Sequence, residues 1–91
     1  MERQELQDKA MTDLEFDILD ELYFVESYSF LKEKLSMEDE PLCRALIELV
    51  DKGWVKAMVS PEKETVCTEE SEFSQCWFLA TKDGLMKHKL G

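Results

Sequence analysis

Apolar residues recur every three or four positions near the start of the chain, which is the spacing of a helix that buries one face. Between residues 13 and 22 these positions are Leu14, Ile18, Leu19 and Leu22. Thr12, followed three residues later by Glu15, forms a capping box, so the sequence predicts a helix that begins at Asp13. Glu15 and the other acids of this helix are expected to face solvent, and residues 23–25 to be enclosed.

A second periodic stretch lies within residues 37–55. Pro41 suits the first position of a helix, because its missing N–H costs nothing there. The apolar stripe that follows consists of Leu42, Leu46, Leu49 and Val50. Gly53 can end the helix in a left-handed conformation, with Trp54 folding back on Leu49. The sequence therefore predicts a helix that runs directly into a strand.

A shorter helix is predicted between these two. Ser27 or Ser29 can cap it, and its apolar side would consist of Phe30, Leu31 and Leu35. Residues 36–39 then make a short turn. A short helix, a tight turn and a longer helix together predict a helix-turn-helix.

The C-terminal part has the alternation that is typical of strands. Residues 55–59 and 75–80 read as two strands. Residues 60–74 between them are polar and acidic, which predicts a long hairpin loop. Thr81 can cap a last helix over residues 82–90, whose apolar side would consist of Leu85, Met86 and Leu90.

Two motifs in this order of elements point to a known family. Residues 45–55 read Ala-Leu-Ile-Glu-Leu-Val-Asp-Lys-Gly-Trp-Val, and residues 78–84 read Phe-Leu-Ala-Thr-Lys-Asp-Gly. The first resembles the end of the recognition helix and the start of the wing in multiple-antibiotic-resistance-type and phenolic-acid-repressor-type regulators. The second is similar to their second wing strand and the Thr-x-x-Gly helix start after it. This resemblance to the winged helix-turn-helix domain implies an α+β fold, with a three-helix core, a β-hairpin wing and a short C-terminal helix.

The length of 91 residues fits one domain. We place the winged-helix domain at residues 12–91 and treat residues 1–11 as an N-terminal tail or helical extension. No apolar run approaches the roughly 20 residues that span a bilayer, and the N-terminus has no apolar signal region. The three cysteines, an odd number without a framework spacing, fit a reducing compartment. We therefore expect a cytoplasmic protein with no membrane partner.

Charge is distributed unevenly along the chain. Residues 13–51 hold twelve acids but only three bases, Lys32, Lys34 and Arg44, and so carry nearly all of the net charge of −10. Such a surface repels phosphate and suits a basic protein partner. The alternative is a solvated helix face that only keeps the protein soluble.

The resemblance implies that the third helix enters the major groove of DNA and that the wing touches the backbone or the minor groove. A recognition helix needs cationic or amide side chains at its outward positions. Here those positions are mostly acidic: Glu38, Asp39, Glu40, Cys43, Arg44, Ile47, Glu48 and Asp51. Arg44 on the helix and Lys63 on the wing are the candidate DNA contacts. DNA binding by a transcriptional regulator is therefore the second hypothesis for function.

The first hypothesis for function is a protein-interaction module that acts in regulation. If the odd-numbered positions of residues 55–59 face the core, alternation places four large side chains on the other face of the hairpin: Trp54, Met58, Trp77 and Leu79. Exposed tryptophan and methionine mark interfaces. The partner would be a basic protein or a second copy in a homodimer. Residues 1–11 or the last helix could instead cover this face.

No catalytic, cofactor-binding or metal-binding residue is predicted. His88 is the single histidine, and no nucleophile motif or glycine-rich phosphate loop is present. The spacing of Cys67, Cys76 and His88 matches no zinc pattern. We therefore expect neither an enzyme nor a cofactor.

Overall fold

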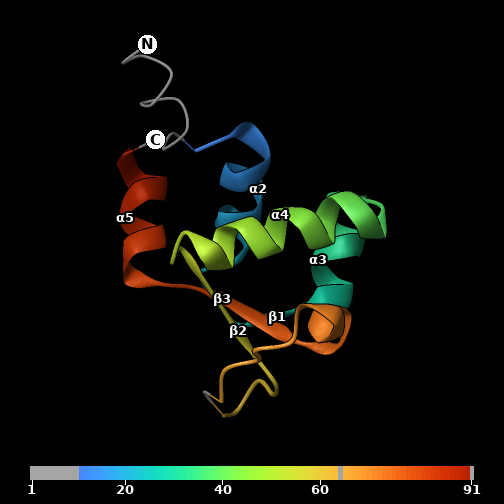
Figure 1. Ribbon diagram of the computed structural model, residues 1–91. Helices are drawn as coiled ribbons and strands as arrows, with labels where there is room; N and C mark the ends of the chain where they lie inside the picture. The colour runs from blue at the N-terminus through green and yellow to red at the C-terminus, as the bar shows by residue number, and fades with distance from the viewer. Residues whose placement is uncertain (1–10, 64, 91) are drawn as a thin grey trace.

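The computed structural model describes residues 11–63 and 65–90. These residues form an α+β fold in which helices pack on a small antiparallel sheet (Figure 1). In chain order the elements are α2 (Asp13–Glu21), β1 (Glu26–Ser27), α3 (Tyr28–Leu35), α4 (Asp39–Asp51), β2 (Val55–Met58), the 3-10 helix η1 (Glu70–Gln75), β3 (Trp77–Ala80) and α5 (Lys82–Leu90). The predicted tail or extension lies, apart from Met11, outside the described residues, so its boundary stays a prediction.

The sheet has the strand order β1-β3-β2, so the last strand in sequence is central. β2 pairs with β3 from Val55 opposite Ala80 to Met58 opposite Trp77. β1 pairs with the other edge of β3, with Glu26 opposite Phe78. The sequence did not predict β1, because two residues are too short to show alternation.

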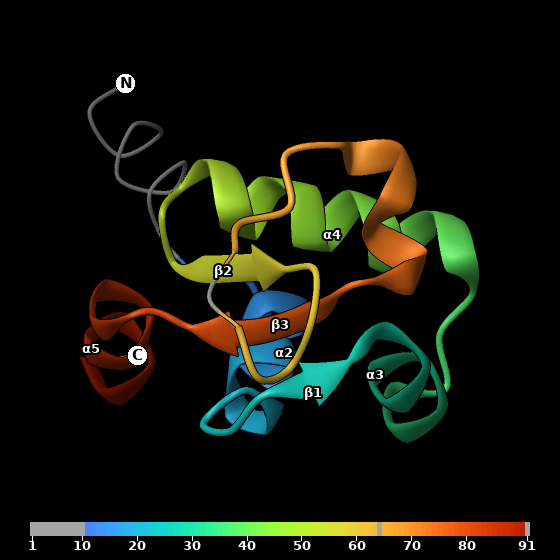
Figure 2. The same cartoon turned by 90° about the horizontal axis from the view of Figure 1, so that it is seen from below.

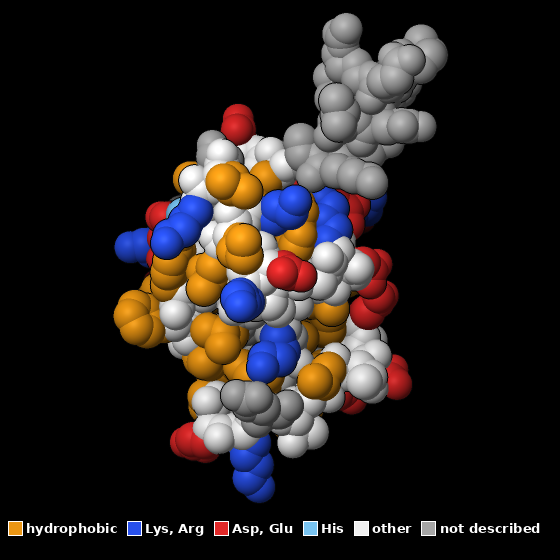
Figure 3. All heavy atoms as spheres, turned by 90° about the vertical axis from the view of Figure 1, so that its left-hand side faces the viewer, with side chains coloured by type: hydrophobic (Ala, Val, Ile, Leu, Met, Phe, Trp, Pro, Cys, Tyr) orange, Lys and Arg blue, Asp and Glu red, His pale blue; other side chains and the backbone are white. Residues whose placement is uncertain are grey.

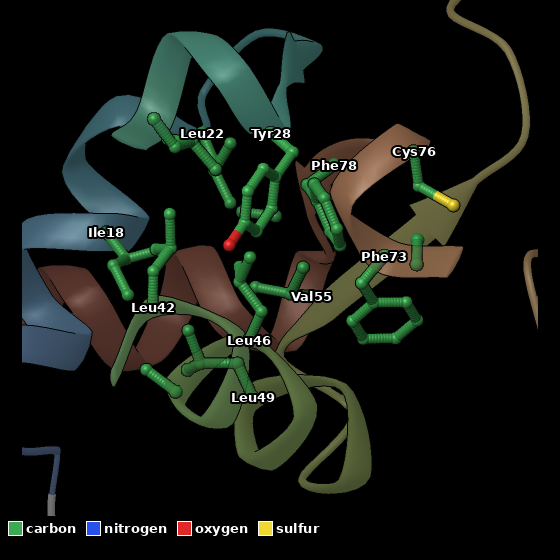
Figure 4. Close-up of a cluster of buried hydrophobic side chains, with 14 of the residues drawn as sticks. Ile18, Leu22, Tyr28, Leu42, Leu46, Leu49, Val55, Phe73, Cys76 and Phe78 are labelled. Atoms are coloured by element: carbon green, nitrogen blue, oxygen red, sulfur yellow. The ribbon is translucent and has the colours of Figure 1, made fainter. Parts of the chain in front are cut away.

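The core lies between α2, α3, α4 and the inner face of the sheet (Figures 2 and 4). The predicted helix stripes are confirmed at the positions that are fully buried: Ile18, Leu19 and Leu22 on α2, and Leu42, Leu46 and Leu49 on α4. At about 25 cal/mol per Å² of apolar surface, burial of such side chains is the main stabilising contribution.

The predicted helix ends are also confirmed. The Glu15 N–H donates to Thr12 Oγ1 at 3.1 Å, and Glu15 Oε1 accepts from the Thr12 N–H at 3.0 Å. At the end of α4, Gly53 has a φ of +79°. The Gly53 and Trp54 N–H groups donate to the carbonyls of Val50 and Leu49, each at 3.0 Å, which is the Schellman arrangement.

The start of α4 differs from the prediction. The helix begins at Asp39, with Glu38 as the N-cap residue, so Pro41 occupies the third helical position. A proline is tolerated throughout the first turn, because none of the first four N–H groups has a partner within the helix. Two acids, Asp39 and Glu40, therefore lie inside the first turn and complement the helix dipole.

Several burial predictions for helix faces were wrong. Glu15 is buried, with 3% of its side chain exposed, and its charge is paired, since Lys52 Nζ lies 2.6 Å from its Oε2. On α3, Leu31 is buried as predicted, but Phe30 is exposed and Tyr28 enters the core instead. Phe24 follows α2 and is 76% exposed rather than enclosed.

The last helix, α5, also packs differently from its prediction. Met86 and Leu90 are exposed, and Gly84 is the buried residue of this helix. Gly84 lies against the backbone of Trp54, so closely that a Cβ atom would meet the Trp54 carbonyl. Because glycine has no side chain, the spacing of apolar residues in this helix could not predict that Gly84 is the buried position.

The predicted hairpin loop is partly folded. Its first part returns to the strand that it leaves, since the Cys67 N–H donates to the Ala57 carbonyl at 2.8 Å. Its second part forms η1, and Phe73 from η1 is buried edge-on against Phe78, with ring centroids 5.4 Å apart. η1 packs beside α3 and α4 (Figure 2).

Across the described part of the chain, no helix has the length and apolar character needed to cross a bilayer.

Candidate interaction surfaces

The structure divides the four residues that were predicted to form one exposed face. Trp77 and Leu79 are partly exposed on the sheet face that points away from the core. Trp54 and Met58 are buried, with 7% and 2% of their surfaces exposed. Neither Trp54 nor Met58 is therefore available to a partner, which corrects the prediction for these two residues.

The burial of Trp54 follows from its position between α4 and α5. Its carbonyl accepts from the Thr81 N–H at 2.9 Å, just where α5 begins. On its other side, Lys52 Nζ lies 4.8 Å from the centre of the indole ring. The residue after the Schellman glycine thus serves as an internal support for the last helix.

The burial of Met58 follows from the returning loop. Met58 forms a β-bridge with Val66, and the Val59 N–H donates to the Thr65 carbonyl at 3.0 Å. Val59, which was expected to face the core, is exposed because β2 ends at Met58. Alternation gives the correct side for Met58, which lies opposite Trp77, but it misplaces Val59 and does not reveal the loop that returns beside β2.

We call the remaining exposed patch the outer sheet face; it consists of Trp77 and Leu79 together with Val66 and Phe24. We include Phe24 because its turn is close to the sheet: the Ala80 N–H donates to the Leu22 carbonyl at 3.0 Å, which holds the α2–β1 turn beside the end of β3. Val66 and Phe24 are exposed by 53% and 76%. Trp77 and Leu79 therefore reach the surface from β3, Val66 from the far side of β2, and Phe24 from the turn before β1. Lys56 lies opposite Leu79 on the same face.

Helix α5 adds cationic and apolar side chains on its exposed side. Lys82, Lys87 and Lys89 are exposed there with Met86. Figure 3 shows the side of the molecule on which α5 lies: hydrophobic and basic side chains are interspersed, and acidic ones gather toward the margins. This side contrasts with the acidic helices.

A second surface lies between α4 and η1, and we call it the α4–η1 groove. It is open to solvent, has a volume of about 620 Å³ and is lined by Tyr28, Asp39, Glu40, Cys43, Arg44, Ile47, Glu70, Ser71 and Ser74. Five of the eight outward positions predicted for this helix, Asp39, Glu40, Cys43, Arg44 and Ile47, thus line a groove whose far wall is η1. Sequence reasoning missed the groove, because nothing in residues 60–74 indicated that η1 returns to α4.

The two candidate DNA contacts lie apart. Arg44 is on α4, and its Nη2 lies 3.2 Å from Glu40 Oε2. Lys63 is in the loop on the opposite side of the sheet (Figure 1). The structure therefore does not bring the two cations into one patch.

Tyr28 and Asp39 form the polar end of the groove. The Tyr28 hydroxyl donates to Asp39 Oδ1 at 2.9 Å, and Lys32 Nζ lies 3.2 Å from the same oxygen. Burial raises the pKa of Tyr28 to about 12, and the hydrogen bond to Asp39 adds to the shift. The hydrogen bonds from Tyr28 and Lys32 lower the pKa of Asp39, so this carboxylate stays charged.

The thiols have no features of catalytic nucleophiles. Burial raises the pKa of Cys76 to about 12, and a hydrogen bond with Cys67 adds to the shift. Burial also raises the pKa of Cys43, with a further contribution from the charge of Glu70. A thiol with a raised pKa is mostly protonated at neutral pH and reacts slowly.

His88 occupies a cluster that the sequence did not reveal. Its Nδ1 lies 2.8 Å from the Tyr23 hydroxyl oxygen, and its Nε2 lies 3.3 Å from Asp20 Oδ1. Its ring stacks on Phe16, with centroids 4.2 Å apart. The cluster fastens α5 to α2, two helices that are more than sixty residues apart in sequence.

In residues 11–63 and 65–90, no group of three or more His, Cys, Asp or Glu side chains is placed to hold a metal ion.

Comparison with protein-family models, with curated proteins and with solved structures gave no match to this chain. Function is therefore inferred from the two surfaces themselves.

Proposed function

We propose that the chain is a winged-helix module that acts in regulation by binding another protein, or a second copy, through its outer sheet face. In the described residues, α2, α3 and α4 are followed by the β2–β3 hairpin and α5, which is the order of elements in that fold. The short strand β1 joins the hairpin on its open edge. This arrangement supports the winged-helix assignment, and a cytoplasmic location belongs to the same proposal.

The observation that carries the proposed function is the apolar outer sheet face. Trp77 and Leu79 come from the central strand and are partly exposed. Val66 lies beyond β2, where it bridges Met58, and exposed Phe24 is in the turn before β1. Large apolar side chains gathered on the surface of a small protein mark interaction sites. Aromatic anchors of this kind supply most of the binding energy at interfaces.

The surface of α4 argues against the second hypothesis, a DNA-binding regulator. Its exposed positions include Glu38, Asp39, Glu40, Glu48 and Asp51. Arg44 is paired with Glu40, and η1 brings Glu70 toward the same helix. Phosphate contacts by cations supply much of the affinity of DNA-binding proteins, and this surface would place carboxylates beside phosphates.

The test replaces Leu79 with glutamate and compares partner capture from the native cell and self-association by sedimentation velocity. Phe30→Glu is the matched control, since Phe30 is an exposed apolar residue on α3, outside the outer sheet face. We expect Leu79→Glu to weaken association at least tenfold, about 1.4 kcal/mol, because it places a charge in an apolar contact. Phe30→Glu should leave association unchanged. Equal effects of the two variants would refute the outer sheet face as the contact.

A further inference from the structure

We propose that the α4–η1 groove is a second docking site, which takes an extended basic segment of a partner protein with one apolar side chain in the groove and Lys or Arg beside it. This site lies on a different part of the surface from the outer sheet face. Binding at the groove can therefore be tested separately from binding at the outer sheet face.

The shape and lining of the groove suit a side chain rather than an ion. Tyr28, Cys43 and Ile47 form its apolar part, and its volume of about 620 Å³ is within the range of small-ligand sites. Ile47 and Cys43 are partly buried and pack against the core, so this lining is held in place by the fold. An apolar side chain that enters the groove would bury surface that water now covers.

The charge around the groove selects a cationic occupant. Asp39 and Glu40 from α4 and Glu70 from η1 stand at its rim, on both walls. Arg44 is the one base among the lining residues, and it pairs with Glu40 at 3.2 Å, while Lys32 pairs with Asp39 at 3.2 Å. These three acids and two bases leave a net charge of −1, which Glu70 supplies from the η1 wall. Asp39 is held ionised by hydrogen bonds from Tyr28 and Lys32. Carboxylates on both sides of an apolar slot attract Lys and Arg and repel phosphate and carboxylate.

The same electrostatics argues against a second copy as the occupant. The chain carries a net charge of −10, concentrated in residues 13–51, which include α4 itself. Two such surfaces brought together would place like charges side by side, which costs several kcal/mol. A separate basic protein meets no such repulsion.

Cys43 provides a reporter inside the groove. It lines the groove and is partly exposed, whereas Cys67 and Cys76 are buried. Alkylation of the intact protein at pH 8 should therefore modify Cys43 first. A segment seated in the groove should shield the Cys43 thiol from the reagent.

The experiment uses a fluorescent peptide of alternating lysine and leucine, in 150 mM salt, with the glutamate–leucine peptide as the negative probe. We expect the lysine–leucine peptide to bind saturably and the glutamate–leucine peptide not to bind. At saturation with the lysine–leucine peptide, alkylation of Cys43 should be at least fivefold slower.

Glu70→Lys should weaken binding of the lysine–leucine peptide at least tenfold. The matched control Asp17→Lys changes an exposed acid on α2 by the same charge and should weaken binding less than twofold. Glu70→Gln gives a milder change, expected to weaken binding about threefold.

Three results would overturn the proposal. Equal weakening by Glu70→Lys and Asp17→Lys would show general charge attraction. Binding without protection of Cys43 would place the peptide elsewhere. Protection of Cys43 that rises with protein concentration in the absence of peptide would identify a second copy as the occupant. Leu79→Glu, which tests the outer sheet face, should leave this binding unchanged.

Discussion

Gly84 shows how one atom decides the placement of a helix. A Cβ on Gly84 would collide with the backbone of Trp54, whereas a Cβ on Gly53 would meet open space. Gly53 instead has a positive φ of 79°, which ordinary residues adopt at a cost of about 1–2 kcal/mol. The two glycines are therefore required for different physical reasons.

The first prediction concerns Gly84→Ala. Alanine is the better helix former by about 1 kcal/mol, yet overpacking against a backbone carbonyl should destabilise the fold by a net 2 kcal/mol or so. Gly53→Ala, the comparison, should cost about 1 kcal/mol through backbone strain alone. Urea unfolding of both variants measures the difference. A stabilised Gly84→Ala variant would show that α5 does not pack on Trp54.

Tyr28 supplies a prediction about pH. Its pKa is about 12 in the folded chain, against about 10 for an ordinary tyrosine. As pH rises, the unfolded chain loses the Tyr28 proton before the folded chain does. The contribution of Tyr28 to the free energy of unfolding is therefore fully present below about pH 10 and is lost as pH rises through 12.

The substitution Tyr28→Phe tests this. It should lower the free energy of unfolding by about 1 kcal/mol at pH 7, from the lost hydrogen bond to Asp39. The difference from wild type should narrow between pH 10 and 11 in urea titrations. A constant difference would contradict the raised pKa.

At the scale of elements, Glu15 joins the start of α2 to the end of α4. One carboxylate oxygen accepts from the Thr12 N–H, and the other lies 2.6 Å from Lys52 Nζ. Lys52 Nζ in turn lies over the Trp54 ring. The buried acid thus links the first helix to the turn that leads into the sheet.

Two substitutions of Glu15 separate its roles. Glu15→Gln keeps a side-chain acceptor for the cap but removes the charge, and it should cost about 1 kcal/mol. Glu15→Ala removes both and should cost about 2 kcal/mol. Chemical unfolding measures each cost, with exposed Asp17→Asn as a control near zero. Equal costs for the two variants would mean that the cap contributes nothing.

Features encoded by neighbouring residues could be predicted from the sequence. The Thr12 capping box, the Gly53 helix end, the Ser27 and Thr81 caps and the buried stripes of α2 and α4 all follow from spacings of a few positions. β1 could not be predicted, because it becomes a strand only by pairing with β3. The burial of Glu15 depends on Lys52, a residue 37 positions away.

The candidate site was predictable only in part, for the same reason. Alternation placed Trp77 and Leu79 on the outer side of the sheet, where they are partly exposed. It could not show that α5 covers Trp54 or that the returning loop covers Met58. The α4–η1 groove depends on the return of η1 to α4, which no local pattern indicates.

Across the whole molecule, charge separates into two regions. The acids of α2 and α4 dominate one region, whereas basic and hydrophobic side chains are interspersed on the side where α5 lies (Figure 3). In our account, the first region repels nucleic acid and attracts cationic protein, while the second holds its partner by apolar contact. The resemblance to DNA-binding regulators would then extend to the fold but not to the ligand, and function would follow from the surface.

The most direct test of this account is a fluorescence-anisotropy titration of a labelled random-sequence DNA duplex. The salt concentration is about 20 mM, well below the physiological ionic strength, because low salt favours electrostatic binding. We predict no rise in anisotropy up to tens of micromolar protein, because the exposed face of α4 is acidic and Arg44 is paired with Glu40. Tight binding that weakens with added salt, and that is lost in Arg44→Ala, would contradict the account and make the chain a DNA-binding regulator.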